Sequence, residues 1–315
     1  MSDGYLWDRS GPADPEVERL ERLLGPLGYR EPRRRRAPYA LAAAAAVVLA
    51  LAAGLCRVAP MGAPAAAWQV ARVEGAARLG ERAAAVAMAV HAGEVVRTAG
   101  GARVELEQDD LGRIDLGPDS ELRAGGGRRV ALERGRLHAF IWAPPRQFVL
   151  DTPSARAVDL GCEYTIEISP DGDGLLRVAM GWVAFQWRGR ESFIPAGAQC
   201  VTRRGAGLGI PYYEDAPPAL EAALGRVEAG DRGALGPLLA AARPRDALTL
   251  WHLLTRAAAG ERAAVYDRFA ELVTLPAGTR SRVLAGDPAA LDRCWDALGL
   301  EGTDWWRGWE REWGR

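Results

Sequence analysis

Four consecutive arginines, Arg33–Arg36, stand directly before a stretch of 20 residues, 37–56, that carries no charge. As an α-helix, a segment of this length spans about 30 Å, which is the thickness of the hydrocarbon core of a bilayer. Basic clusters next to such a segment stay on the cytoplasmic side. The sequence therefore predicts a cytoplasmic tail at 1–36, one transmembrane helix at 37–56, and residues 57–315 on the far side of the membrane.

Two alternatives to an uncleaved anchor remain open. Ala65-Ala66-Ala67 before Trp68 could form a signal-peptidase site, although the leader would carry a long polar segment of 36 residues before its apolar part. Cys56 could be a lipoprotein cysteine, although Leu55 stands before it, where a small residue is normally required. In all three cases the bulk of the chain is exported.

The N-terminal tail contains a segment with helical periodicity. Asp14 and Pro15 are typical of a helix start, as N-cap and first helical residue. Apolar residues then recur on one face of the helix at Val17, Leu20, Leu24 and Leu27. This stripe could rest on the membrane, or it could dock a cytosolic partner, which would stabilise so short a helix.

Beyond a proline- and alanine-rich linker at 57–67, residues 68–202 show a period of two with frequent turn residues. This pattern predicts an all-β sandwich or roll. The alternating runs are 95–98, 102–106, 113–116, 128–132, 136–140, 148–150, 155–160, 163–168, 175–180 and 182–187.

A second linker at 203–218 leads into an α-helical domain at 219–315, where the period returns to 3.6. Short connections between amphipathic helices predict a small bundle or a stack of helical hairpins. The expected helices are 219–228, 233–242, 246–258, 261–274, 288–298 and 304–313.

The β segment resembles the FecR family of bacterial cell-envelope regulators. The resemblance rests on an ordered series of short motifs, one of which departs from the family pattern because Cys162 stands where the family has threonine. The motifs are His91–Thr98 ("G-x-x-V-x-T"), Gly112–Ser120 (a strand, "D-G-S" turn, strand and "P-x-S" turn), Leu132–Leu137 ("L-x-x-G-x-L"), Phe148–Pro153 ("F-x-V-x-T-P"), Ala157–Thr165 ("A-x-V-x-G-T-x-F") and Val178–Val183 ("V-x-x-G-x-V").

The resemblance implies a transmembrane signalling protein of the bacterial inner membrane, with a single span, a cytoplasmic N-terminus and a periplasmic bulk. Its periplasmic β domain would bind another envelope protein, and its N-terminal tail would contact a sigma factor or another cytosolic protein. The alternative is a non-signalling envelope scaffold or assembly factor that uses its helical tail as the binding module.

Composition and motifs argue against several other functions. A net charge of −1 provides no field for nucleic acid. The sequence has no metal-binding spacing, nucleophile elbow, phosphate loop or dinucleotide fingerprint, so we expect neither a cofactor nor catalysis. His91, His138 and His252 are interpreted as surface or hydrogen-bonded core residues.

A pair of cysteines and a stripe of tryptophans lead to more specific hypotheses. Cys162 and Cys200 flank the last β segment of an exported domain, which favours a disulfide over two buried thiols. Three tryptophans, Trp305, Trp309 and Trp313, share one helix face. They are expected to fill the helical core together with Trp251 and Trp295; a partner-binding surface and a membrane-interface contact are the alternatives.

Overall fold

The computed structural model describes residues 15–24 and 68–300. The expected transmembrane helix at 37–56 and the expected last helix at 304–313 lie outside these residues. Within the two described ranges, no helix combines the length and the apolar character needed to cross a membrane. The chain divides into two units, Met1–Gly62 and Ala63–Arg315.

In the first unit, the structure confirms the predicted helix in the N-terminal tail. Helix α2 covers Pro15–Leu24 and begins at the proline that the sequence indicated. Acidic residues lie in its first turn and Arg22 in its last, an arrangement that complements the helix dipole. Leu20 is 56% exposed, so at least one residue of the apolar stripe is accessible to a partner.

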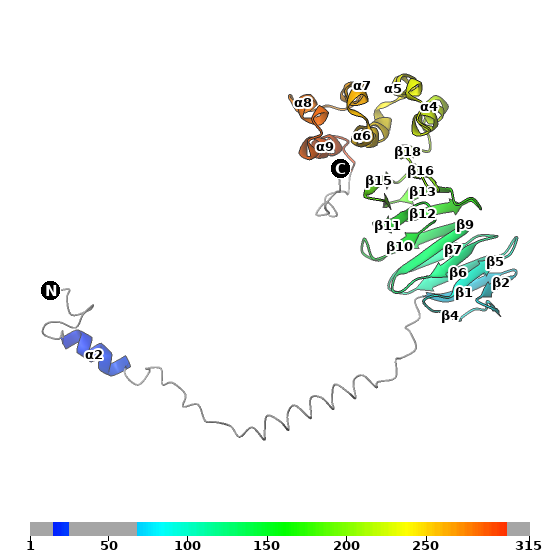
Figure 1. The fold of residues 1–315 in the computed structure, drawn as a ribbon. Coiled ribbons are helices and arrows are strands. Elements are labelled where there is room, and N and C mark those ends of the chain that lie inside the picture. The colour runs from blue at the N-terminus through cyan, green and yellow to red at the C-terminus, as the bar shows by residue number, and fades with distance from the viewer. Residues whose placement is uncertain (1–14, 25–67, 301–315) are drawn as a thin grey trace. The chain divides into compact units, whose positions relative to one another are not determined.

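The second unit begins with a β domain in which two sheets share one strand (Figure 1). The first sheet runs in the order β4, β1, β6, β7, β9, β12, β13 and β16, with β17 and β18 both paired to β16. The bounds of these strands are β1 (Trp68–Glu74), β4 (Ala89–Val90), β6 (Arg103–Gln108), β7 (Gly112–Leu116), β9 (Arg129–Ile141), β12 (Glu163–Ile168), β13 (Gly174–Met180), β16 (Ala198–Arg203), β17 (Gly207–Leu208) and β18 (Tyr212–Tyr213).

The second sheet runs in the order β3, β2, β5, β8, β9, β10, β11, β14 and β15, and only the β9–β10 pair in it is parallel. The additional strands are β2 (Ala77–Leu79), β3 (Arg82–Ala83), β5 (Val95–Thr98), β8 (Glu121–Ala124), β10 (Val149–Asp151), β11 (Arg156–Asp159), β14 (Trp182–Trp187) and β15 (Arg190–Pro195). The structure thus confirms a β domain that is followed by a helical region.

Strand β9 replaces two strands that the sequence predicted separately, at 128–132 and 136–140. Its first half pairs with β8 and β10, and its second half pairs with β7 and β12. The change of sheet occurs near Gly135, which has φ 94° and whose missing Cβ would lie 2.2 Å from the hydroxyl of Ser120. The glycine lets one strand pass between both sheets without a break.

The seam at this point joins three of the sequence motifs. The Ser120 hydroxyl accepts a hydrogen bond from the Arg136 amide at 3.0 Å. The Thr98 hydroxyl donates to the Gly117 carbonyl at 2.6 Å and accepts from the Ser120 amide at 2.9 Å. Thr98 and Ser120 therefore satisfy backbone groups at the seam, and Gly135 permits the close approach of Ser120.

The segment 203–218, predicted as a linker, is partly β structure. β18 pairs with β16 through Ala198↔Tyr213 and Gln199↔Tyr212, and β17 pairs with it at Thr202↔Leu208. Gly205 lies in the turn between β16 and β17, and Gly209 and Pro211 lie between β17 and β18. Gly207 is part of β17, and Pro218 begins α4.

Five of the six predicted helices are present, and the sixth lies outside the described residues. α8 was not predicted, since its six residues are too few to show a helical period. The helical elements are α4 (Pro218–Glu228), η2 (Arg232–Ala234), α5 (Leu235–Ala241), η3 (Pro244–Asp246), α6 (Ala247–Arg256), α7 (Ala259–Leu272), α8 (Thr279–Leu284) and α9 (Pro288–Asp296).

The helices and the β domain share one hydrophobic core. The Trp295 ring of α9 lies 5.5 Å from the Phe193 ring of β15, 5.9 Å from the Trp182 ring of β14 and 4.6 Å from the Trp251 ring of α6. Trp251 and Trp295 are buried, as expected. His252 is a satisfied core histidine, since its Nε2 accepts from the Phe193 amide at 3.0 Å and its Nδ1 lies 3.0 Å from the Leu248 carbonyl.

Candidate binding cleft at the tip of a hairpin

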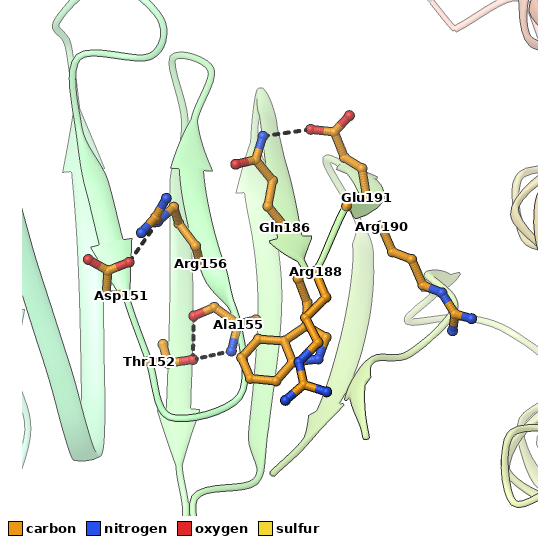
Figure 2. A pocket seen from close by; sticks show the side chains of 10 residues that line it. Asp151, Thr152, Ala155, Arg156, Gln186, Arg188, Arg190 and Glu191 are labelled. Carbon is orange, nitrogen blue, oxygen red and sulfur yellow. Dashed lines mark hydrogen bonds and ion pairs between the residues drawn. The ribbon is translucent and has the colours of Figure 1, made fainter. Parts of the chain in front are cut away.

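An open cleft of about 620 Å³ lies where the β10–β11 turn meets the tip of the β14–β15 hairpin (Figure 2). We call it the tip cleft. Its lining is mainly polar, and three of its side chains are arginines. The lining residues are Asp151, Thr152, Ala155, Arg156, Gln186, Trp187, Arg188, Gly189, Arg190 and Glu191.

The carboxylates of the tip cleft are already engaged. Asp151 accepts a hydrogen bond from Nε of Arg156 at 2.8 Å and forms an ion pair with Arg129, whose Nε lies 3.1 Å away. Glu191 accepts from the side-chain amide of Gln186 at 2.9 Å. Figure 2 shows the Asp151–Arg156 and Gln186–Glu191 interactions. The β10–β11 turn is closed by Thr152, whose hydroxyl accepts from the Ala155 amide at 3.0 Å. These bonds hold the polar side chains that line the cleft in fixed positions.

Arg188 differs from the other arginines of the cleft in its backbone and in its contacts. Its φ is 47°, in the left-handed region, and its guanidinium lies 5.2 Å from the centre of the Trp187 ring. Within the described ranges, no carboxylate forms an ion pair with it. Figure 2 shows Arg188 beside the Thr152–Ala155 turn and Arg190 directed away from that turn.

Trp187 is held from behind by Gly207, at the start of β17. A Cβ at Gly207 would lie 2.1 Å from Cδ1 of the indole, so a larger residue there would displace the ring. The half-buried indole is therefore a fixed wall that supports the Arg188 guanidinium. A cleft with three arginines and an aromatic wall can bind an anion.

A second cleft of about 510 Å³ crosses the first sheet next to His138 on β9. His138 lies between two carboxylates, with Nε2 3.0 Å from Glu163 and Nδ1 3.4 Å from Asp115. The hydrogen bond to Asp115 raises the pKa of His138, and Glu163 acts in the same direction, while burial opposes both. Thr165, the cross-strand partner of His138 on β12, also lines this cleft.

The predicted disulfide between Cys162 and Cys200 is absent, and both residues are buried free thiols. Sheet register explains the error. Cys162 precedes β12, Cys200 lies opposite Leu176 on β13, and β13 stands between β12 and β16. Two strand spacings amount to about 10 Å, beyond the roughly 7 Å that a disulfide can bridge.

Each thiol has a hydrogen-bond partner of its own. Cys162 donates to the buried carboxyl group of Asp159, and Cys200 lies 3.4 Å from the Gly209 carbonyl. Burial raises the pKa of Asp159 to about 7, although hydrogen bonds from Cys162 and from the Gly161 amide act in the opposite direction. Cys294 is also a buried core residue, as its position in a helical stripe indicated.

The remaining predicted site residues are only partly covered by the structure. Val17, Leu20 and Leu24 belong to α2. Leu27 and the three tryptophans Trp305, Trp309 and Trp313 lie outside the described residues. Within the described ranges, no group of acidic, histidine and cysteine side chains could hold a metal ion.

The tip cleft was not predicted. The signal that could have found it is the run Trp187–Arg190, in which two arginines flank Gly189. Recognising it requires the pairing Trp187↔Arg190, which leaves a loop of two residues and places Arg188 at a position of positive φ.

Comparison with known proteins identifies the β domain. Residues 94–184 match the family model described as FecR protein, so this part of the chain is a FecR family domain. The matched range contains the seam of Thr98, Ser120 and Gly135 and the β10–β11 side of the tip cleft. It ends within β14, before the tip of the β14–β15 hairpin.

The comparison with solved structures gives weaker similarity. Two crystal structures of a candidate anti-sigma factor from Parabacteroides distasonis match with 17% identity and a TM-score of 0.34. The matches cover 41% of this chain and 63% and 62% of the other chains, so the chain spans less than two thirds of their length. No curated protein matches the chain.

Proposed function

We propose that this chain is a single-pass regulator of the bacterial inner membrane. Its FecR domain binds another envelope protein in the periplasm, and its N-terminal tail passes that contact to a sigma factor or another cytosolic protein. The observation that carries the proposal is the FecR domain at residues 94–184. The uncharged segment 37–56 behind four arginines supports the topology, and the exposed Leu20 on α2 supports a cytosolic contact.

The topology can be tested with a reporter that is active only in the periplasm. Fused after Arg315 it should be active, and fused at Gly28 it should be inactive. Replacing Arg33–Arg36 with neutral residues should scramble the orientation, because the charge bias sets it. An inactive reporter at Arg315 would overturn the proposed topology.

The signalling output can be tested by transcript profiling of a strain that lacks the gene. We expect a defined set of transcripts to change, and the wild-type chain to restore them. Leu20→Asp should fail to restore them at an equal amount of membrane-inserted protein, because a charge would disrupt an apolar contact. Arg19→Gln, on an exposed part of the same helix, is the matched control.

A non-signalling envelope scaffold is the second candidate. It is favoured by α4–α9, which lie beyond the FecR match and are joined to the β domain by a common core. Under this alternative, deletion would leave transcripts unchanged and would lower the amount or alter the location of an envelope protein recovered with the wild-type chain by crosslinking.

A further inference from the structure

The turn at the tip of the β14–β15 hairpin places an arginine at a position of positive φ, which arginine rarely adopts. Trp187 pairs with Arg190, so Arg188 and Gly189 alone form the loop, with φ values of 47° and 75°. Positive φ at both central residues is the requirement of a type I′ turn, where asparagine, aspartate and glycine are strongly preferred. Arginine has no local hydrogen bond to offset its Cβ clash there, so backbone preference does not explain its presence.

The side chain of Arg188 is also left without an ionic partner. Among residues 15–24 and 68–300 no carboxylate pairs with its guanidinium, which lies 5.2 Å from the centre of the Trp187 ring. Arg156 nearby donates through Nε to Asp151, and a guanidinium carries further N–H groups that can bind an anion. The cleft therefore holds guanidinium donors in excess of its own carboxylates.

We propose that the tip cleft binds an acidic peptide segment of a partner protein, with a carboxylate held by Arg188 and Arg156 against the Trp187 wall. This inference rests on the proposed function, because it names the kind of surface that the FecR-domain protein recognises. The planar guanidinium matches a carboxylate through two parallel hydrogen bonds. A volume of about 620 Å³ accommodates several peptide side chains rather than a single ion.

The geometry favours a protein segment over an anionic membrane surface. Asp151 and Glu191 line the cleft beside the arginines and would oppose a flat negative surface. Among the described residues, the exposed large apolar side chains are Leu20, Val86, Trp142 and Met180, and none of them lies at the hairpin tip. The Trp187 indole at the tip is half-buried and packs against Gly207, so it is not free to enter a bilayer.

The test uses the full-length protein in phosphatidylcholine nanodiscs and a fluorescent decamer of glutamate, with binding followed by fluorescence anisotropy. Arg188→Asn should weaken binding about tenfold, the effect of losing one charge-assisted hydrogen-bonding group. The same variant should leave the melting temperature unchanged or raise it, because asparagine suits the left-handed turn position. Arg123→Gln removes an exposed arginine from β8 and should leave binding unchanged.

Three outcomes would overturn the proposal. Arg188→Asn could bind the decamer as tightly as the wild type, or Arg123→Gln could weaken binding equally, which would show general charge attraction. Vesicles containing phosphatidylglycerol could bind in an Arg188-dependent manner while the decamer does not, which would make the membrane the occupant. Loss of decamer binding with unchanged transcripts would instead confirm the cleft and refute the signalling role.

Discussion

The two ends of the β14–β15 hairpin use arginine in opposite ways. Along β15, Arg256 from α6 is half-buried and donates to the Gly209 carbonyl at 2.9 Å, to the Glu191 carbonyl at 3.3 Å and to the Ser192 hydroxyl. At the tip, Arg188 is exposed, occupies a left-handed turn position and has no ionic partner among the described residues. We call these regions the closed end and the open tip.

The comparison shows how a sheet edge can be protected while a binding surface remains. An edge strand offers unpaired backbone groups to other chains. At the closed end, His252 accepts the Phe193 amide, and Arg256 satisfies carbonyls of neighbouring segments. The open tip has no such cover, and its polar groups remain accessible to a ligand. Arginine alone therefore does not mark a site; its burial and its partners decide its role.

The largest expected effect comes from breaking the closed end at Trp295. Trp295→Ala should lower the free energy of unfolding by about 3–5 kcal/mol, because the buried indole contacts both β strands and α6. Denaturant unfolding of the purified full-length protein measures this. Ala289→Ser, on the exposed face of α9, is the control. A small loss would show that the helices are not part of one core with the β domain.

The next effect concerns an aspartate in a different environment from that of the open tip. Asp159 of β11 is buried, whereas Asp151 of β10 is paired with two arginines at the open tip. The pKa of Asp159 is raised from 3.8 to about 7 by burial. Its folded form therefore binds the proton more tightly, so its contribution to stability is complete below about pH 4 and is lost as the pH rises towards 7. The loss is on the order of 4 kcal/mol at 1.36 kcal/mol per pKa unit.

Asp159→Asn should remove this loss, because asparagine has no charge to bury. Unfolding curves of the wild type and the variant at pH 4.5, 6 and 8 test this. The difference between them should shift in favour of the variant as the pH rises. Parallel stability profiles across this range would show that the Asp159 carboxyl group titrates normally.

The sequence predicted the regular parts of this structure because its periodicity reports burial on one side. The predicted runs 95–98, 163–168 and 182–187 coincide with β5, β12 and β14. β15 was missed because four consecutive residues in it, Ser192–Pro195, are buried. A strand that is buried on both faces shows no alternation of apolar and polar residues. The outer edge of β15 is covered by α6, a contact that no local pattern can reveal.

Features that depend on register could not be predicted. Excluding the disulfide required knowing that β13 separates Cys162 from Cys200. Finding the tip cleft required the pairing that makes Arg188 a turn residue, and also the approach of Gly207 to Trp187 from a distant segment. Sequence alone gives the residues of such sites, while the fold decides which of them meet.

A smaller effect is expected for Arg256 itself. Arg256→Gln should destabilise the protein by about 2 kcal/mol, because the shorter amide leaves buried carbonyls without their donor. Thermal unfolding of the full-length protein followed by tryptophan fluorescence provides the measurement. Unchanged stability would mean that water satisfies the edge of β15 equally well.

The smallest effect is expected from the matched change at the tip, Arg190→Gln. Both arginines lie at β15: Arg256 donates hydrogen bonds to it, and Arg190 is its first residue. Arg190, however, is exposed and forms no ion pair within the part of the chain that the structure describes. Removing its charge breaks no buried hydrogen bond, so the melting temperature should change by less than about 2 °C. The same thermal unfolding experiment compares both variants directly. A loss as large as that of Arg256→Gln would show that the tip also stabilises the fold, and the contrast between the two ends of the hairpin would fail.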